Sequence, residues 1–186
     1  IKRAHDRGHS DLYLLFLFLP AFLDSLLQVM GHVNAQSPLA PDQKRDSHGL
    51  NCFDEYDALR LGVKVQRVAQ RAPIVMQTST GGAQEYVRYG RFKFQAEGQD
   101  AELTIYQANY GFFLPFVDSL AETETYPAGR YLEPEPLPGD RFLVDFNIAY
   151  NPYCAYNEMW SCPITPAENR LKAPIRAGEK LFHAQS

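Results

Sequence analysis

Residues 86–107, with the sequence YVRYGRFKFQAEGQDAELTIYQ, decide the fold class. Apolar and polar positions alternate before the polar turn at 97–100, and Leu103, Ile105 and Gln107 continue the alternation after it. A period of two on both sides of a short turn predicts a β-hairpin. In its first strand the alternation puts one set of residues on one face: Tyr86, Arg88, Gly90, Phe92 and Phe94. The other face would carry Val87, Tyr89, Arg91 and Lys93.

Shorter segments around this hairpin carry strand signals as well. Residues 59–66 alternate between apolar and polar, 73–77 form a second short strand, and 110–116 are an apolar run that contains Pro115. A second hairpin is predicted from 129–133 and 141–148 around the turn at 138–140. Closely spaced strands with turn residues between them predict an all-β fold of mainly antiparallel sheet, either a sandwich or a barrel.

Two segments are expected to lie outside these strands. A short N-terminal helix is predicted at 42–48, between Pro41 and Gly49. Residues 127–174 contain eight of the 13 prolines, so the C-terminal region after about residue 149 is predicted to be a Pro-rich loop.

The first 35 residues have the parts of a secretory signal. Lys2, Arg3 and Arg7 precede twelve uncharged residues at 12–23, and Val33-Asn34-Ala35 fits a cleavage site. We therefore expect an exported protein, periplasmic or extracellular, in which 36–186 form a single β-rich domain. An uncleaved membrane anchor and a buried hydrophobic helix are the alternatives for this segment.

Composition and missing motifs exclude several classes of function. With 18 basic and 22 acidic residues the net charge is −4, so nothing supports nucleic-acid binding. The chain lacks a P-loop, a G-x-G-x-x-G loop, a G-x-S-x-G elbow and an H-E-x-x-H motif. Beyond residue 35 only His48 and His183 remain, so we expect no metal site and no cofactor. Enzymatic activity and oligomeric state stay open.

Polar and aromatic residues concentrate at 145–170, where Asp145 and Asn147 would share one face of a strand, with Val144, Phe146 and Ile148 on the other. The leading interpretation is a site for a small polar ligand, a saccharide or a cell-envelope fragment. The alternatives are a carboxylate-based hydrolase, with Asp145 and Glu168 as acid and base, and a structural or partner-interaction module. The candidate ligand-binding residues are Arg130, Tyr131, Asp145, Asn147, Tyr150, Asn151, Tyr156, Trp160, Glu168 and Asn169.

Several of these residues also have a purely structural interpretation. Asp145 is suited to accept backbone N–H groups that hold the following loop. Arg130 is suited to clamp an anionic ligand or to pair internally with Asp145 or Glu168. The tyrosines, with Tyr126 and Tyr153 among them, either line a pocket or pack on strands. The run at 78–82 is a turn or an anion-binding loop.

Two of the three cysteines are expected to form a disulfide. Cys154 and Cys162 are eight residues apart, which suits a disulfide in an exported chain. Two buried free thiols or a metal or redox site are the alternatives, and Cys52 would be the odd thiol.

Several segments resemble an uncharacterised prokaryotic family catalogued as domain of unknown function 1684. They are SPL at 37–39, GLNCF at 49–53, TSTG at 78–81, LPF.D at 114–118, ETYPAGRYL at 124–132, DFNIAYNPYCAYN at 145–157 and CPITPAENRLKAPIRAGEK at 162–180. The resemblance covers about residues 37–180, and it implies membership of the family without implying an activity. In the family an aromatic residue is expected where this chain has Cys52, so that thiol is taken as incidental.

Overall fold

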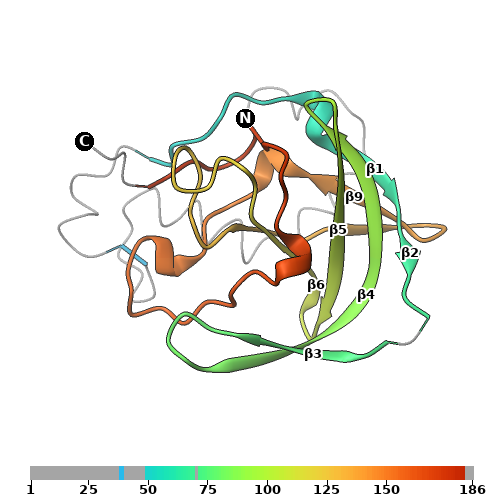
Figure 1. Ribbon diagram of the computed structural model, residues 1–186, viewed down its shortest axis with the longest axis horizontal. Helices are drawn as coiled ribbons and strands as arrows, with labels where there is room; N and C mark the ends of the chain where they lie inside the picture. The colour runs from blue at the N-terminus through green and yellow to red at the C-terminus, as the bar shows by residue number, and fades with distance from the viewer. Residues whose placement is uncertain (1–37, 40–48, 70, 183–186) are drawn as a thin grey trace, which may run out of the picture. The chain divides into compact units, whose positions relative to one another are not determined.

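The computed structural model describes Pro38 and Leu39, residues 49–69 and residues 71–182. The predicted helix at 42–48 and the predicted signal at 1–35 lie outside the described residues. From Leu50 onward the described chain forms nine β-strands and four 3₁₀ turns, with no longer helix among them (Figure 1). The mainly antiparallel β fold predicted from the hairpin pattern is confirmed.

The strands form two antiparallel sheets. One sheet has the strand order β1-β9-β8, and the other has the order β2-β4-β5-β6-β7, with β3 also paired to β4. The strand bounds are β1 Arg60–Lys64, β2 Gln66–Arg67, β3 Pro73–Gln77, β4 Ala83–Ala96, β5 Gln99–Ala108, β6 Gly111–Phe116, β7 Arg130–Leu132, β8 Glu135–Leu137 and β9 Arg141–Asp145. The 3₁₀ turns are η2 Asp57–Leu59, η3 Phe146–Ile148, η4 Tyr153–Ala155 and η5 Ala167–Asn169.

The predicted first hairpin is β4–β5, closed by Glu97 and Gly98, which both have positive φ. The predicted faces of its first strand are wrong, because β4 contains a β-bulge. Arg88 pairs with Tyr106 and Phe92 pairs with Leu103, but Tyr89 has no partner on β5. Since Tyr106 and Leu103 are three residues apart, they lie on opposite faces, and so do their partners.

The bulge divides the apolar residues of β4 between two cores. Beyond the bulge, Phe92 and Phe94 face the larger core, whereas Tyr86 belongs to a smaller cluster on the other face. Gly90 at the bulge is required by close packing. A Cβ atom there would lie 2.5 Å from Val65 Cγ1 and 2.7 Å from the carbonyl oxygen of Gln66.

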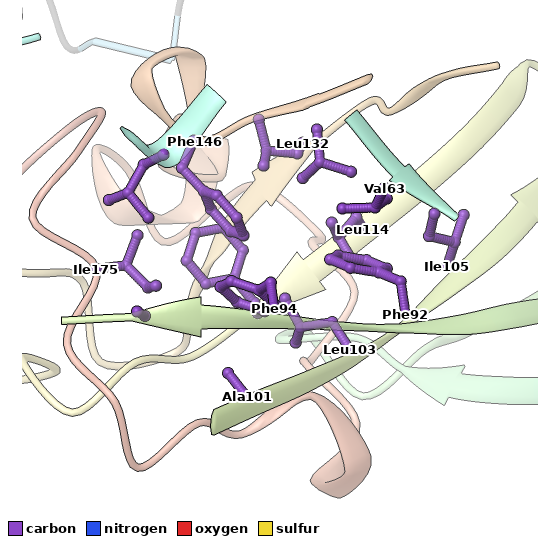
Figure 2. Close-up of a cluster of buried hydrophobic side chains, with 14 of the residues drawn as sticks. Val63, Phe92, Phe94, Ala101, Leu103, Ile105, Leu114, Leu132, Phe146 and Ile175 are labelled. Atoms are coloured by element: carbon purple, nitrogen blue, oxygen red, sulfur yellow. The ribbon is translucent and has the colours of Figure 1, made fainter. Parts of the chain in front are cut away.

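The larger core lies between the two sheets. Figure 2 shows side chains from β1, β4, β5, β6 and β7, joined by Phe146 and Ile175, pointing toward one another. The ring of Phe146 stacks on Phe94 and meets Phe116 edge-on, with centroid distances of 5.3 and 5.2 Å. Residues from strands far apart in sequence thus share one buried cluster, which fixes the ends of β6, β7 and β9.

The second hairpin differs from the prediction. Segment 129–133 was predicted to pair with 141–148. In the structure it contains β7, which pairs with β6, and the strand that pairs with β9 is β8. Pro136 explains why β8 was missed: it lacks an N–H and interrupts the strand signal. It is tolerated because β8 is an edge strand of its sheet.

Candidate functional site

The structure distributes the candidate residues over five places rather than one. Asp145 and Asn147 lie at the end of β9. Arg130, Asn151 and Tyr156 lie around Glu179, Arg130 at its main-chain carbonyl and the other two at its buried carboxylate. Glu168 and Asn169 lie against β4 and β5, Tyr131 and Tyr150 lie in a cluster of tyrosines, and Trp160 lies near the two cysteines.

Asp145 and Asn147 are together, but not through a strand. Strand β9 ends at Asp145, whose Oδ1 accepts hydrogen bonds from the backbone and side-chain nitrogens of Asn147 at 3.0 and 2.9 Å. Asn147 in turn exchanges two hydrogen bonds with the backbone of Tyr56. Asp145 therefore caps the η3 turn, as its structural interpretation expects. The predicted apolar face is wrong at Ile148, which is 56% exposed because η3 turns it outward.

The cap at Asp145 makes a testable difference between two substitutions. Asp145→Ala removes the acceptor, and we expect a loss of about 1 kcal/mol in the free energy of unfolding. Asp145→Asn keeps an oxygen for the cap and loses only an ion pair to Arg60, whose side chain is 57% exposed, so we expect less than about 0.5 kcal/mol. Urea unfolding of the three proteins measures both values; equal losses would contradict the capping role.

Arg130 is fully buried, and its predicted pairing with Asp145 or Glu168 is wrong. Its Nη2 donates to Asp118 Oδ2 at 2.9 Å and to the carbonyl of Ile175 at 2.8 Å, and its Nη1 donates to the carbonyls of Ala177 and Glu179. The guanidinium thus ties β7 to Asp118 and to the C-terminal segment. The pairing of Asp118 with Arg130 was missed, because the LPF.D segment at 114–118 does not show which cation its carboxylate binds.

Glu179 is a second buried carboxylate, and it holds two of the candidate residues. Its Oε2 accepts the backbone N–H of Asn151 at 2.8 Å, and its Oε1 accepts the Tyr156 hydroxyl. Burial raises the pKa of Glu179, and the hydrogen bonds from Asn151 and Tyr156 oppose that shift. Asn151 and Tyr156 therefore serve to fasten the loop after β9 to the end of the domain.

Glu168 and Asn169 fasten η5 to the six-stranded sheet. Glu168 Oε1 accepts Arg88 Nε at 2.8 Å and the hydroxyl of Tyr106. Burial alone would raise the pKa of Glu168, but these hydrogen bonds and the charges of Arg88 and Arg91 outweigh it and lower the pKa. Asp145 and Glu168 thus belong to different clusters with different basic partners, so nothing in the geometry favours an acid–base pair.

The tyrosine cluster, defined as Tyr86, Tyr110, Tyr131, Tyr150 and Glu133, lies on the face of the six-stranded sheet opposite the larger core. The rings of Tyr131 and Tyr150 meet edge-on at 6.0 Å. The hydroxyls of Tyr110 and Tyr86 interact, and that of Tyr86 donates to Gln84 Oε1 at 2.8 Å. Tyr110 is nevertheless 64% exposed.

Glu133 is the carboxylate of this cluster. Its Oε1 accepts the Tyr150 hydroxyl, and its Oε2 has no hydrogen-bond partner among the described residues. Burial raises the pKa of Glu133, with the bond from Tyr150 opposing it, and no described Lys or Arg forms an ion pair with it. Sequence reasoning missed both Glu133 and Tyr110. Glu133 ends the segment 129–133 and Tyr110 begins the run 110–116, and both segments were predicted only as strands; in the structure Tyr110 lies in a turn.

The cysteines and Trp160 form the remaining group. All three cysteines are free thiols, and the backbone N–H of Cys154 lies 3.3 Å from Cys162 Sγ. Trp160 meets Tyr153 edge-on at 5.0 Å, and its carbonyl accepts the Ser79 hydroxyl. The run at 78–82 thus bonds to the segment at 160–162.

Within residues 49–69 and 71–182, no three His, Cys, Asp or Glu side chains are grouped so that they would hold a metal ion. In the described part of the chain there is no helix of the length and hydropathy needed to cross a membrane.

Comparisons with known proteins identify relatives of unknown function. A family model described as protein of unknown function, DUF1684, matches residues 45–180. The solution NMR structure of the uncharacterised protein from gene locus rrnAC0354 of Haloarcula marismortui is 31% identical to this chain. The match covers 80% of this chain and 85% of that one, with a TM-score of 0.63. No curated protein matches the chain.

Proposed function

This chain belongs to the DUF1684 family of proteins of unknown function, and we propose that it binds a small polar ligand of the saccharide type at Tyr110 and Glu133. The observation that carries the proposal is the open ring of Tyr110. An aromatic side chain that is 64% exposed leaves apolar area in water, and its hydroxyl interacts with that of Tyr86. Such an exposed ring is suited to receive the apolar face of a sugar ring.

Glu133 supplies the polar half of such a site. A sugar hydroxyl is a hydrogen-bond donor, and Glu133 Oε2 is an acceptor with no partner among the described residues. Because no described cation neutralises this carboxylate, a neutral polyhydroxy ligand fits it better than an anionic one. An apolar platform with a few placed polar groups is the usual composition of a small-molecule site.

The other interpretations have less support. Six candidate residues have a structural role, because their hydrogen bonds are made to other groups of the protein: Asp145, Asn147, Arg130, Asn151, Tyr156 and Asn169. In the proposal these residues form the scaffold of the site. Export remains part of the proposal, supported by the basic start and apolar run at 1–23. A saccharide or cell-envelope fragment is the ligand class that matches such a location.

Binding is tested by calorimetric titration with glucose, N-acetylglucosamine, cellobiose and the N-acetylglucosamine–N-acetylmuramic acid disaccharide. We expect at least one to bind, and we expect Tyr110→Ala and Glu133→Gln each to raise its Kd by about tenfold or more. Tyr56→Ala is the matched control, because Tyr56 is another exposed tyrosine, at 52%. Equal weakening by Tyr56→Ala, or no loss with the other two variants, would contradict the proposal.

The ionised carboxylate of Glu133 is also expected to lower the free energy of unfolding. A carboxylate with a structural role would raise it, so this effect distinguishes a binding residue from a structural one. The folded-state pKa of Glu133 is raised from 4.5, so ionisation costs more in the folded chain than in the unfolded one. The free energy of unfolding of the wild type therefore falls as pH rises from about 4.5 through the higher pKa of the folded state. In Glu133→Gln the side chain has no proton to lose, so its stability lacks this pH dependence. At about pH 8 we expect the variant to be about 0.5–1 kcal/mol more stable than the wild type, and at about pH 4 the gap should close. Urea unfolding at both pH values measures the gap; a destabilised variant at the higher pH would show that the carboxylate is structural.

A further inference from the structure

Cys154 and Cys162 lie side by side, apart from the tyrosine and glutamate of the proposed site. The backbone N–H of Cys154 lies 3.3 Å from Cys162 Sγ, and the two thiols interact with each other. The seven residues between them form a partly exposed loop that contains Met159, which is 84% exposed.

The two thiols have different surroundings. Cys162 is buried, with 8% exposure, and its backbone is fixed by two hydrogen bonds with Ser79 at 2.9 and 3.1 Å. Cys154 is partly exposed, and the Tyr126 hydroxyl lies 3.8 Å from its sulfur. An attacking thiol must be accessible and a resolving thiol need only be adjacent, so the geometry gives each cysteine one of these roles.

Hydrogen-bond donors surround the accessible sulfur. Hydrogen bonding from the Cys162 thiol is the main cause that lowers the pKa of Cys154, to about 6. Burial opposes this shift, whereas Tyr126 and Ser79 act in the same direction as Cys162. The same bond raises the pKa of Cys162, as does burial. This difference favours the thiolate at the partly exposed Cys154 and the proton at Cys162.

We propose that Cys154 and Cys162 are a redox-active dithiol that reduces a hydroperoxide, with Cys154 as the nucleophile and Cys162 as the resolving thiol. The Cys154 thiolate attacks the outer oxygen of the hydroperoxide, the O–O bond breaks, and the leaving oxygen takes a proton and departs as an alcohol or water. This leaves a sulfenic acid on Cys154. The Cys162 sulfur then attacks it, an S–S bond forms, and the sulfenic oxygen leaves as water with the Cys162 proton. The dithiol loses two electrons and the hydroperoxide gains them; a reductant of the dithiol class restores the pair.

The first test treats the reduced full-length protein with hydrogen peroxide and analyses intact mass and peptides. We expect a loss of two hydrogen atoms, a Cys154–Cys162 disulfide, and recovery with dithiothreitol. In Cys162→Ser the reaction should stop at a sulfenic acid on Cys154, which dimedone traps, and in Cys154→Ser no disulfide should form. Cys52→Ser is the matched control and should behave as the wild type. A wild-type pair that stays reduced, or a disulfide that involves Cys52, would overturn the proposal without relying on any variant.

The second test measures which thiol reacts first and why. Burial and the charge of Glu179 raise the pKa of Cys52 above its usual 9.0, although Cys52 is exposed. At about pH 6, about half of Cys154 but less than about a thousandth of Cys52 is thiolate. The lower intrinsic nucleophilicity of the more acidic thiol reduces this difference to an expected rate advantage of at least about 20-fold for Cys154 with iodoacetamide. Tyr126→Phe should move the pH midpoint of the Cys154 reaction upward. Faster labelling of Cys52 would refute the assignment, as would a midpoint that Tyr126→Phe leaves unchanged.

Discussion

Arg130→Met is expected to lower the free energy of unfolding by about 3–5 kcal/mol, because it leaves the buried Asp118 carboxylate without its cation. The side chains of Arg130 and Asp118 are 0% and 2% exposed. The carbonyls of Ile175, Ala177 and Glu179 would lose their donors as well. Denaturant unfolding followed by far-UV circular dichroism measures the change.

An exposed arginine provides the matched control for this prediction. Arg176 forms an ion pair with Glu97 at 2.7 Å, but its side chain is 46% exposed. Solvent screens such a pair, so Arg176→Met should leave the unfolding midpoint almost unchanged. If the two substitutions had similar effects, Arg130 would not be the fastening point of β7 and the C-terminal segment.

Asn169→Leu is expected to cost about 3–5 kcal/mol, because its side-chain amide replaces hydrogen bonds that the sheet cannot make. Thr104 on β5 lies opposite Pro115 on β6 by continuation of their register, and Pro115 has no N–H. Asn169 Oδ1 accepts the Thr104 N–H at 2.8 Å, and its Nδ2 donates to the carbonyls of Thr104 and Pro115 at 2.9 and 2.8 Å. The amide therefore joins two strands where their direct pairing ends.

The stability of the Asn169→Asp variant at different pH values tests the same role of the Asn169 amide. The carboxylate keeps an acceptor for Thr104 N–H, but its second oxygen faces two carbonyls and repels them. Protonation would restore a donor, so the loss relative to the wild type should shrink as pH falls. Asn157→Asp is the control, because Asn157 uses only its oxygen, which accepts the N–H of Met159. A loss in Asn169→Asp that does not depend on pH would contradict the role assigned to its amide.

The sequence pattern was sufficient to predict most of the strands, but it missed β8 and did not show which faces of the strands are buried. Alternation located β1, β3, β4 and β5, because a half-buried strand needs a period of two. The β-bulge at Tyr89 was not predicted, because the neighbouring Gly90 has no side chain and the alternation of apolar and polar residues continues across the register shift. Pro115 was a usable signal: a proline inside a buried strand leaves a carbonyl on its neighbour without a donor, which some side chain must supply.

Among the candidate site residues, contacts between residues close in sequence could be predicted, and contacts between distant residues could not. The cap between Asp145 and Asn147 is a contact two residues long, and local spacing predicted that they would be together. The pairs Arg130–Asp118 and Asn169–Thr104 join segments that are 12 and 65 residues apart, which no local spacing encodes. Glu133 was missed for this reason: its burial is decided by Tyr150 and the neighbouring tyrosines, which come from other strands and turns.

The most direct test of the proposed site is the NMR titration of the isotope-labelled full-length protein with the same four sugars. The account predicts saturable shifts of backbone amides centred on Tyr110, Glu133 and Tyr150, and their loss in Glu133→Gln with the rest of the spectrum retained. Shifts confined to the segment at 153–162, or no saturable shift with any of the four sugars, would contradict it.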